Sequence, residues 1–271
     1  MTTSQISTLA GYEDFAPSLL VEKRGSVHVV SINRPEAFNA VDEQVHEALT
    51  GIWRVLANDD DVRAVVTTGA GGKAFSAGGD MVMFQRLIKD PNARARQIAD
   101  ARMVFMEVIN FGKPLVSAVK GAAVGLGCSL ALLSDLLVMG ESSYLADPHV
   151  AVGLTAGDGG AAMLPLLVGM MKAKEYVLFG DKITASIAKD LNLVTRVVPD
   201  DKVLDEALGL AERLAGLPAQ AVQSTKSAMN LHLSRAALGV LEYALAAEYT
   251  SFTTEEFKDR VAAFLARSNK A

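Results

Sequence analysis

Hydrophobic and polar residues alternate between Ser18 and Asn33, on both sides of an Arg24-Gly25 pair. This alternation predicts a β-hairpin that turns at the pair. From Asp42 the period lengthens, and apolar residues recur every three or four positions, which predicts an amphipathic helix capped by Asp42. Further apolar runs and helical patterns predict strands at 62–68, 115–119 and 136–139 and helices at 93–110 and 126–134.

The order of these elements indicates the fold class. Strands, glycine-rich loops and helices alternate up to residue 140, whereas helical patterns dominate after residue 160. This order predicts an α/β core in residues 1–200, followed by a helical C-terminal region in residues 201–271. No linker rich in Gly, Ser or Pro separates the two parts, so the helices are expected to pack on their own core or on a neighbouring subunit.

Composition and charge exclude several classes of partner. Half of the 271 residues are hydrophobic and 21% are charged, which is typical of a globular protein. The net charge of −5, without a basic cluster, gives no reason to expect nucleic acid as a partner. The most apolar segment, residues 121–134, is shorter than the ~20 residues that a membrane-spanning helix needs, so no membrane partner is expected.

The chain has one cysteine, Cys128, and four histidines. One cysteine forms no internal disulfide, and this set offers too few ligands for a zinc site. We therefore expect no metal site and a reducing compartment, the cytoplasm, as the location of the protein.

Glycine-rich loops are the next candidates for chemistry. In the loop at 69–74, Thr67 stands where a phosphate-binding P-loop needs its first glycine, and Ala74 stands where a Ser or Thr would follow Gly-Lys. A dinucleotide fingerprint needs glycine at three set positions, and neither residues 69–74 nor residues 125–130 supply the third, so no nicotinamide or flavin cofactor is expected.

The glycines of two segments, residues 74–81 and 120–131, are candidates for binding a ligand through the backbone. Glycine lets the backbone approach a ligand closely, and the second segment leads into a helix whose free N–H groups favour negative charge. Together the two loops could hold one developing oxyanion. The alternative is that each loop is only a tight turn.

Six motifs in a fixed order give the chain a specific resemblance. They are Asn-Arg-Pro-Glu-Ala-Phe-Asn-Ala at 33–40, Phe-Ser-Ala-Gly-Gly-Asp at 75–80, the segment from Lys-Pro to Gly-Leu-Gly at 113–127, Ser-Asp at 134–135, Gly-Asp-Lys-Ile-Thr-Ala at 180–185 and Ser-Thr-Lys-Ser-Ala-Met-Asn at 224–230. With these motifs the chain resembles the crotonase, or enoyl-CoA hydratase/isomerase, superfamily over nearly its whole length. The resemblance implies a spiral of ββα units, a helical C-terminal trimerisation region and a homotrimer or hexamer.

The resemblance also implies roles for individual residues. The backbone N–H groups of Gly79 and Leu126 would form the oxyanion hole for a thioester carbonyl, which becomes an enolate during the reaction. Coenzyme A would be part of the substrate, and no separate cofactor is expected. The residues assigned to substrate binding are Ala37, Phe38, Ala40, Ala77, Asp80, Met81, Gly125 and Pro148.

The sequence departs from the hydratases of this superfamily at two positions. Ser129 and His149 stand where those enzymes carry two glutamates around one water. His149 is suited to act as an acid or base near neutral pH, and Asp158, nine positions on, is expected to bond one ring nitrogen and so orient the other. The alternatives are a structural histidine bonded to a backbone carbonyl and an aspartate that caps the helix after Gly159.

Three functions are consistent with these residues. The leading hypothesis is an enzyme that acts on an acyl-CoA thioester through a stabilised enolate, with hydration, isomerisation or hydrolysis as the outcome. The second is a β-diketone hydrolase, because the spacing of His149 and Asp158 resembles the dyad of that branch of the superfamily. The third is a non-catalytic acyl-CoA-binding member that has lost its glutamates.

Overall fold

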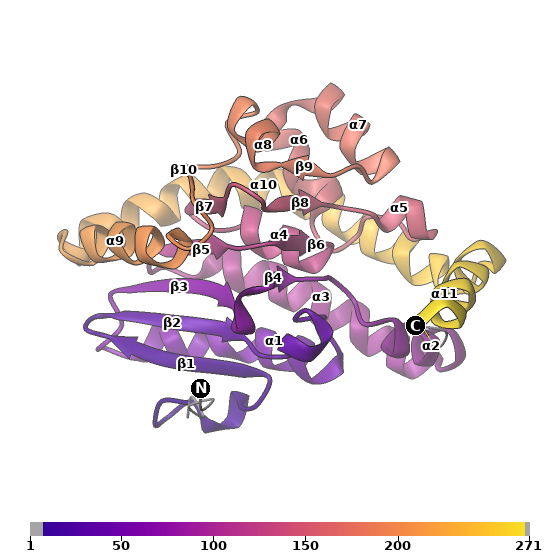
Figure 1. Ribbon diagram of the computed structural model, residues 1–271, viewed down its shortest axis with the longest axis horizontal. Helices are drawn as coiled ribbons and strands as arrows, with labels where there is room; N and C mark the ends of the chain where they lie inside the picture. The colour runs from indigo at the N-terminus through magenta and orange to yellow at the C-terminus, as the bar shows by residue number, and fades with distance from the viewer. Residues whose placement is uncertain (1–7, 269–271) are drawn as a thin grey trace.

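Two β-sheets form the centre of the molecule (Figure 1). The computed structural model describes residues 8–268. The larger sheet has the order β1 (Leu19–Arg24), β2 (Val27–Ile32), β3 (Ala64–Gly69), β5 (Leu115–Val119), β7 (Leu136–Gly140) and β10 (Arg196–Val198). The smaller sheet has the order β4 (Ala74–Ser76), β6 (Ala122–Val124), β8 (Tyr144–Ala146) and β9 (Ile183–Thr184). Among the strands that the structure describes, only the β1–β2 and β8–β9 pairs are antiparallel.

From β3 to β8, consecutive strands of the chain alternate between the two sheets. Strands β3, β5 and β7 lie in the larger sheet, and each is followed within a few residues by a short strand, β4, β6 or β8, of the smaller sheet. After β4 and after β6 a helical segment returns the chain to the larger sheet, whereas after β8 the chain passes through helices and β9 before it reaches β10. This arrangement confirms the predicted spiral of ββα units. The three short strands were not predicted, because three residues are too few to display a period of two.

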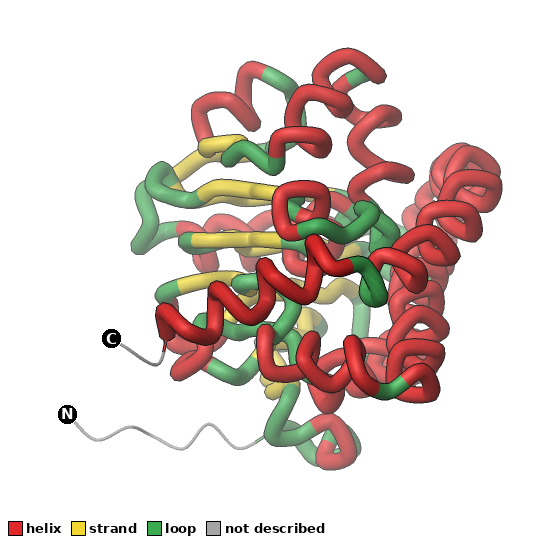
Figure 2. The backbone as a smooth tube through the Cα atoms, turned by 90° about the vertical axis from the view of Figure 1, so that its right-hand side faces the viewer, coloured by secondary structure: helices red, strands yellow, loops and turns green. Residues whose placement is uncertain are grey.

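The helices surround the sheets (Figure 2). In the core region they are α1 (Glu43–Asn58), α2 (Met81–Lys89), α3 (Pro91–Asn110), α4 (Leu126–Leu132), α5 (His149–Val152), α6 (Gly160–Val168), α7 (Met170–Phe179) and α8 (Ala185–Asp190), with short 3-10 turns at Glu13–Phe15, Pro35–Ala37 and Ala70–Gly72. Asp42 caps α1 as predicted, since its side chain accepts a hydrogen bond from the N–H of Val45 over 2.9 Å.

Three helices follow residue 201, namely α9 (Val203–Ala215), α10 (Ala219–Ser251) and α11 (Glu255–Ser268). Helix α9 packs on one face of the larger sheet, where its apolar side chains meet those of β2, β3, β5 and β7. Helix α10 packs against α3 and α6. No helix in residues 8–268 is long and apolar enough to cross a membrane.

A buried lysine fixes α10 to the core. The Nζ atom of Lys226 lies 2.8 Å from Oδ2 of Asp135 and donates to the carbonyl oxygen of Lys113 over 2.8 Å. The same ammonium group lies over the ring of Phe111. These contacts join three of the sequence motifs, 113–127, 134–135 and 224–230, and they hold α10 where its second half reaches the cavity described below.

Candidate active site

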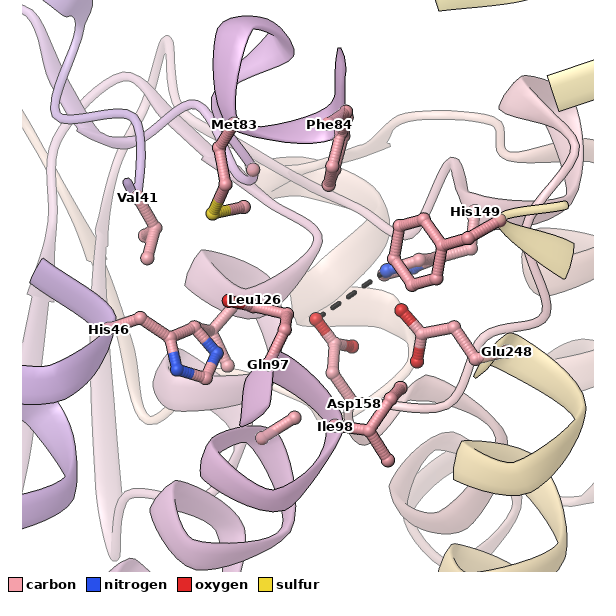
Figure 3. Close-up of a pocket in the computed structure, with 13 residues that line it drawn as sticks. Val41, His46, Met83, Phe84, Gln97, Ile98, Leu126, His149, Asp158 and Glu248 are labelled. Carbon is pink, nitrogen blue, oxygen red and sulfur yellow. Dashed lines mark ion pairs between the residues drawn. The ribbon is translucent and has the colours of Figure 1, made fainter. Parts of the chain in front are cut away.

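Four residues predicted to carry chemistry line one cavity, although they are far apart in the sequence (Figure 3). They are Gly79, Leu126, His149 and Asp158. The remaining lining comes from Val41, His46, Met83, Phe84, Gln97, Ile98, Ala101, Glu248 and Phe252. The cavity therefore combines apolar walls with several ionisable groups.

The smaller sheet explains how the two glycine loops come together. Strands β4 and β6 are adjacent and parallel, so the loops that follow them leave the same edge of the sheet. Gly79 lies in the loop between β4 and α2, and Leu126 is the first residue of α4, directly after β6. Within the described residues, neither of their backbone N–H groups donates a hydrogen bond. Both groups are available to a ligand in the cavity.

Gly79 packs closely against an aromatic side chain of the cavity. A Cβ atom at Gly79 would lie 2.3 Å from Cζ of Phe84, which lines the cavity. Gly125, which was assigned to substrate binding, has a φ of +52° and lies beneath the imidazole, since a Cβ atom there would be 3.6 Å from Cε1 of His149. The side chain of His149 thus covers the start of α4.

His149 lies between two carboxylates. Its Nδ1 atom makes a short contact with Oδ1 of Asp147, and its Nε2 atom lies 3.5 Å from Oδ2 of Asp158. Asp158 therefore faces one ring nitrogen, whereas Asp147, to which the sequence analysis assigned no role, contacts the other. The turn from β8 through Pro148 into α5 brings the Asp147 carboxylate back to the residue two positions later, so this contact is local.

The two carboxylates determine the charge of the imidazole. Burial lowers the pKa of His149, but the negative charges of Asp158 and Asp147 outweigh this effect and hold the pKa well above its usual value. Burial has the opposite effect on Asp158, because it raises the pKa of this carboxyl group. The positive charge of His149 opposes the increase. At neutral pH the imidazolium is thus the favoured form of His149.

Asp158 does not cap the following helix. Helix α6 begins after Gly159, and no side chain caps it. The Asp158 carboxylate turns instead toward Ser129, whose hydroxyl donates to Oδ1 over 3.3 Å. Ser129, on α4, therefore binds a carboxylate that comes from the loop before α6.

Close contacts with the site explain the glycines around Asp158. A Cβ atom at Gly157 would lie 2.2 Å from Oε2 of Glu248, and one at Gly160 would lie 1.5 Å from Oδ2 of Asp147. A Cβ atom at Gly159 would meet Oγ of Ser129 at 2.7 Å. The Gly-Asp-Gly-Gly turn therefore lets the backbone pass directly against three polar side chains of the site.

Two ionisable residues of the cavity were not assigned a function from the sequence. His46 comes from α1 and is 2% exposed, and Glu248 comes from α10 and is 7% exposed. The sequence contains a pattern that points to Glu248. This residue falls at helical spacing within the row of apolar residues Leu241, Leu245 and Phe252, which are buried in the structure. A carboxylate at an apolar position of a helix is a candidate for function.

The predicted substrate-binding residues lie around the cavity rather than in its lining. Ala37, Phe38 and Ala40 form a loop beside Ala77, whose N–H donates to the carbonyl oxygen of Phe38 over 3.0 Å. Pro148 directly precedes His149 at the start of α5.

Asp80 has a structural role in the same region. It caps α2 through the N–H of Val82 and pairs with Arg34 over 2.9 Å, and Arg34 also donates to the carbonyl oxygen of Ala40. Met81 lines a separate groove formed with α5 and α11. Through these contacts Arg34 joins the 37–40 loop to the loop that carries Gly79.

Donor atoms of Asp147, His149 and Asp158 lie within 4.8 Å of one another, a spacing that would also suit a metal ion. The imidazole, however, lies between the two carboxylates, which face opposite ring nitrogens. Because one ion cannot replace both of these contacts, the arrangement fits an imidazolium better than a metal.

The ββα spiral and the paired glycine loops define a protein of the crotonase fold class. The profile of the enoyl-CoA hydratase/isomerase family matches residues 22–270. The chain belongs to this family and is an enzyme of the hydratase/isomerase type.

Relatives and solved structures agree with this assignment. A probable enoyl-CoA hydratase from Rhizobium meliloti (strain 1021) is 34% identical over 250 residues, which are 92% of this chain and 95% of the relative. A 2,3-dehydroadipyl-CoA hydratase from Escherichia coli (strain K12) is 34% identical over 91% of this chain and 95% of its own length. The crystal structure of an enoyl-CoA hydratase/isomerase from Mycobacterium paratuberculosis superposes with a TM-score of 0.88, at 44% identity over 91% of this chain and 98% of that one.

Proposed function

We propose that this enzyme hydrates the conjugated double bond of an acyl-CoA thioester, with the ion pair of His149 and Asp158 in place of two glutamates. The main observation is that Nε2 of His149 and Oδ2 of Asp158, 3.5 Å apart, line the same cavity as two backbone N–H groups that have no partner among the described residues. Hydration needs one group that accepts a proton from water and one that donates a proton to carbon. This pair supplies both.

The roles of the two side chains follow from their charges. Asp158 accepts a proton from the water as its oxygen adds to the β-carbon. The electrons of the double bond move to the thioester oxygen, where the N–H groups of Gly79 and Leu126 stabilise the enolate. The enolate then collapses as Nε2 of His149 gives its proton to the α-carbon, which completes the addition of one water.

After this step Asp158 holds a proton and His149 is neutral. A transfer between Oδ2 and Nε2 restores the ion pair, since these two atoms face each other directly. Asp147, in contact with Nδ1, keeps the ring oriented and stabilises its charged form. Ser129 orients the carboxylate.

Coenzyme A enters this scheme as part of the substrate, and the steps above need no further cofactor. The loop of Ala37, Phe38 and Ala40 beside Ala77 is proposed as one wall of the coenzyme A channel. Its support is the backbone contact that joins this loop to the segment carrying Gly79.

A β-diketone hydrolase is the second candidate. One observation favours it, namely that a carboxylate faces Nε2 of His149 in an arrangement equally suited to attack of water on a carbonyl carbon. A non-catalytic acyl-CoA-binding protein is less consistent with the site, because burial of Asp147, His149, Asp158 and Glu248 brings a desolvation cost that binding alone does not require.

A substrate panel tests the proposal. Purified enzyme is assayed with enoyl-CoA esters of four to ten carbons and, separately, with cyclic β-diketones in the absence of coenzyme A. Hydration of an enoyl-CoA that is lost in His149→Ala supports the proposal. Turnover of a diketone without coenzyme A would overturn it in favour of the second candidate, and turnover unchanged in His149→Ala would show that the histidine is not catalytic.

We also propose that the enzyme is a cytoplasmic homotrimer or hexamer. Apolar side chains exposed on α6 and α7 support an assembly, and they include Leu166, Leu167, Met170, Met171, Leu178 and Phe179. Light scattering coupled to gel filtration measures the mass directly, and a mass of one chain, 28.6 kDa, would contradict the proposed assembly.

A further inference from the structure

Glu248 is a buried acid in the cavity that the proposed mechanism does not use. Its Oε2 atom is buried and has no hydrogen-bond partner within the described residues. Figure 3 shows its carboxyl group reaching from α10 into the cavity beside Asp158 and His149. The following inference rests on the proposed acyl-CoA chemistry and concerns which acyl group the site accepts.

The surroundings hold Glu248 in place and in its neutral form. The backbone at Gly157 packs directly against Oε2, so the side chain has little room to leave the cavity. Burial raises the pKa of Glu248 to about 8, with the charges of Asp158 and Asp147 adding to the effect and that of His149 opposing it. A neutral carboxylic acid has an O–H group to donate.

His46 forms a second polar position in the cavity wall (Figure 3). Its Nδ1 atom is buried and has no partner among the described residues. Burial lowers the pKa of His46 to about 4, so the ring is neutral. Gln97 adds an amide to the lining.

A hydrocarbon acyl chain would leave these groups without partners. Enclosing an unsatisfied donor beside an apolar chain weakens binding by roughly 10- to 100-fold per group. An acyl group that carries its own oxygen avoids this loss. Because the two backbone N–H groups are already committed to the thioester oxygen in the proposed mechanism, this would be a second oxygen of the substrate.

We propose that Glu248 donates a hydrogen bond to a second oxygen in the acyl group, and that the substrates of this enzyme are therefore acyl-CoA thioesters with a keto or hydroxyl group in the acyl chain. In this role Glu248 determines specificity, whereas His149 and Asp158 carry the proton transfers. Its contribution is largest for the oxygenated substrate and absent for the hydrocarbon one.

The test compares matched substrates. The kcat/KM of hex-2-enoyl-CoA is measured beside those of its 4-oxo and 5-oxo derivatives, and the better of the two derivatives is expected to exceed the parent by at least about tenfold. Glu248→Leu is expected to abolish this preference, whereas Glu248→Gln, which keeps a donor, retains most of it. Glu242→Leu is the matched control, because Glu242 lies on the same helix but its side chain is 55% exposed and pairs with Arg102.

A binding measurement separates this inference from the proposed function. Calorimetry with His149→Ala compares hexanoyl-CoA with 4-oxohexanoyl-CoA and 5-oxohexanoyl-CoA, none of which can be hydrated. Tighter binding of an oxo ester that disappears when Glu248→Leu is added supports the inference, even if no enoyl-CoA is turned over. Turnover of enoyl-CoA without an oxo preference leaves the proposed function intact and overturns the inference. If Glu248→Leu fails to fold, the comparison is made without this substitution. Tighter binding of hexanoyl-CoA than of both oxo esters then overturns the inference.

Discussion

The hydroxyl group of Ser129 donates a hydrogen bond to the Asp158 carboxylate over 3.3 Å. The carboxylate comes from the Gly-Asp-Gly-Gly turn at residues 157–160, and the serine on α4 provides the donor that orients it. Two residues that are 29 positions apart in the chain thus meet in one site.

The first prediction concerns this hydrogen bond. Ser129→Ala is expected to lower kcat by about 10- to 100-fold, because a hydrogen bond to a charged group contributes roughly 1.5–3 kcal/mol. Ser129→Cys, which keeps the branching of the side chain but donates weakly, should fall between the alanine variant and the wild type. An alanine variant with the wild-type kcat would show that Asp158 needs no support from Ser129.

The second prediction concerns Asp147 and pH. Asp147 helps to raise the pKa of His149, so Asp147→Asn should lower this pKa. If the protonated ring is the acid, activity is present below the pKa of His149 and lost above it, and the alkaline limb of the kcat profile should move to lower pH in the variant. The kcat itself is expected to decrease by on the order of 10²–10⁴-fold. An unshifted alkaline limb would contradict the assignment of Asp147.

The third prediction concerns stability. Burial raises the pKa of Glu248 from 4.5 to about 8, so the folded state holds a proton that the unfolded state releases above pH 4.5. Stability attributable to this group is therefore highest below pH 4.5 and decreases as the pH rises toward 8, by on the order of a few kcal/mol. Urea unfolding of Glu248→Gln should show a smaller decrease than the wild type between these values. Parallel curves would mean that Glu248 is ionised in the folded protein.

The fourth prediction concerns the oxyanion hole. Leu126 is the first residue of α4, a position that tolerates proline, so Leu126→Pro removes the N–H group while the helix can persist. We expect kcat to fall by roughly 10²–10³-fold. Leu126→Ala retains the N–H group and is the control for the lost side chain. Equal kcat values for the two variants would contradict the role of this donor.

The fifth prediction concerns the glycine turn. Gly160→Ala brings a Cβ atom within 1.5 Å of Oδ2 of Asp147, so it should disturb the Asp147–His149 contact and lower stability by about 2 kcal/mol or more. The matched control is Gly209→Ala in α9, where a Cβ atom meets nothing within 4 Å and the helix gains up to about 1 kcal/mol. Thermal unfolding and kcat of both variants check this expectation, which fails if Gly160→Ala behaves like the control.

The sequence predicted those parts of the fold that have a strong local pattern. The hairpin at residues 19–32, the Asp42 cap and strand β5 are set by alternation, a capping side chain and a run of apolar residues. The three-residue strands β4, β6 and β8 have no such pattern, because their pairing partners lie far away in the chain.

The site was only partly predictable for a related reason. The positions of Gly79, Leu126, His149 and Asp158 followed from motifs, and these residues do converge on one cavity. The contact of Asp147 with His149 depends on the geometry of the turn at Pro148, which spacing alone does not define. Glu248 reaches the cavity from α10, which packs against α3 and α6 and is joined to the core by Lys226, 22 positions earlier in the same helix, and none of these long-range contacts is visible in the sequence.

In the proposed reaction His149 gives a proton to the α-carbon while Asp158 serves as the base. Hydration of crotonyl-CoA in deuterium oxide, followed by nuclear magnetic resonance of the product, measures this proton transfer. We expect one deuterium at the α-carbon in the wild type, together with a decrease of roughly 10²–10⁴-fold in its rate of incorporation in both His149→Ala and Asp158→Asn. Incorporation at the wild-type rate in either variant would contradict the proposed reaction.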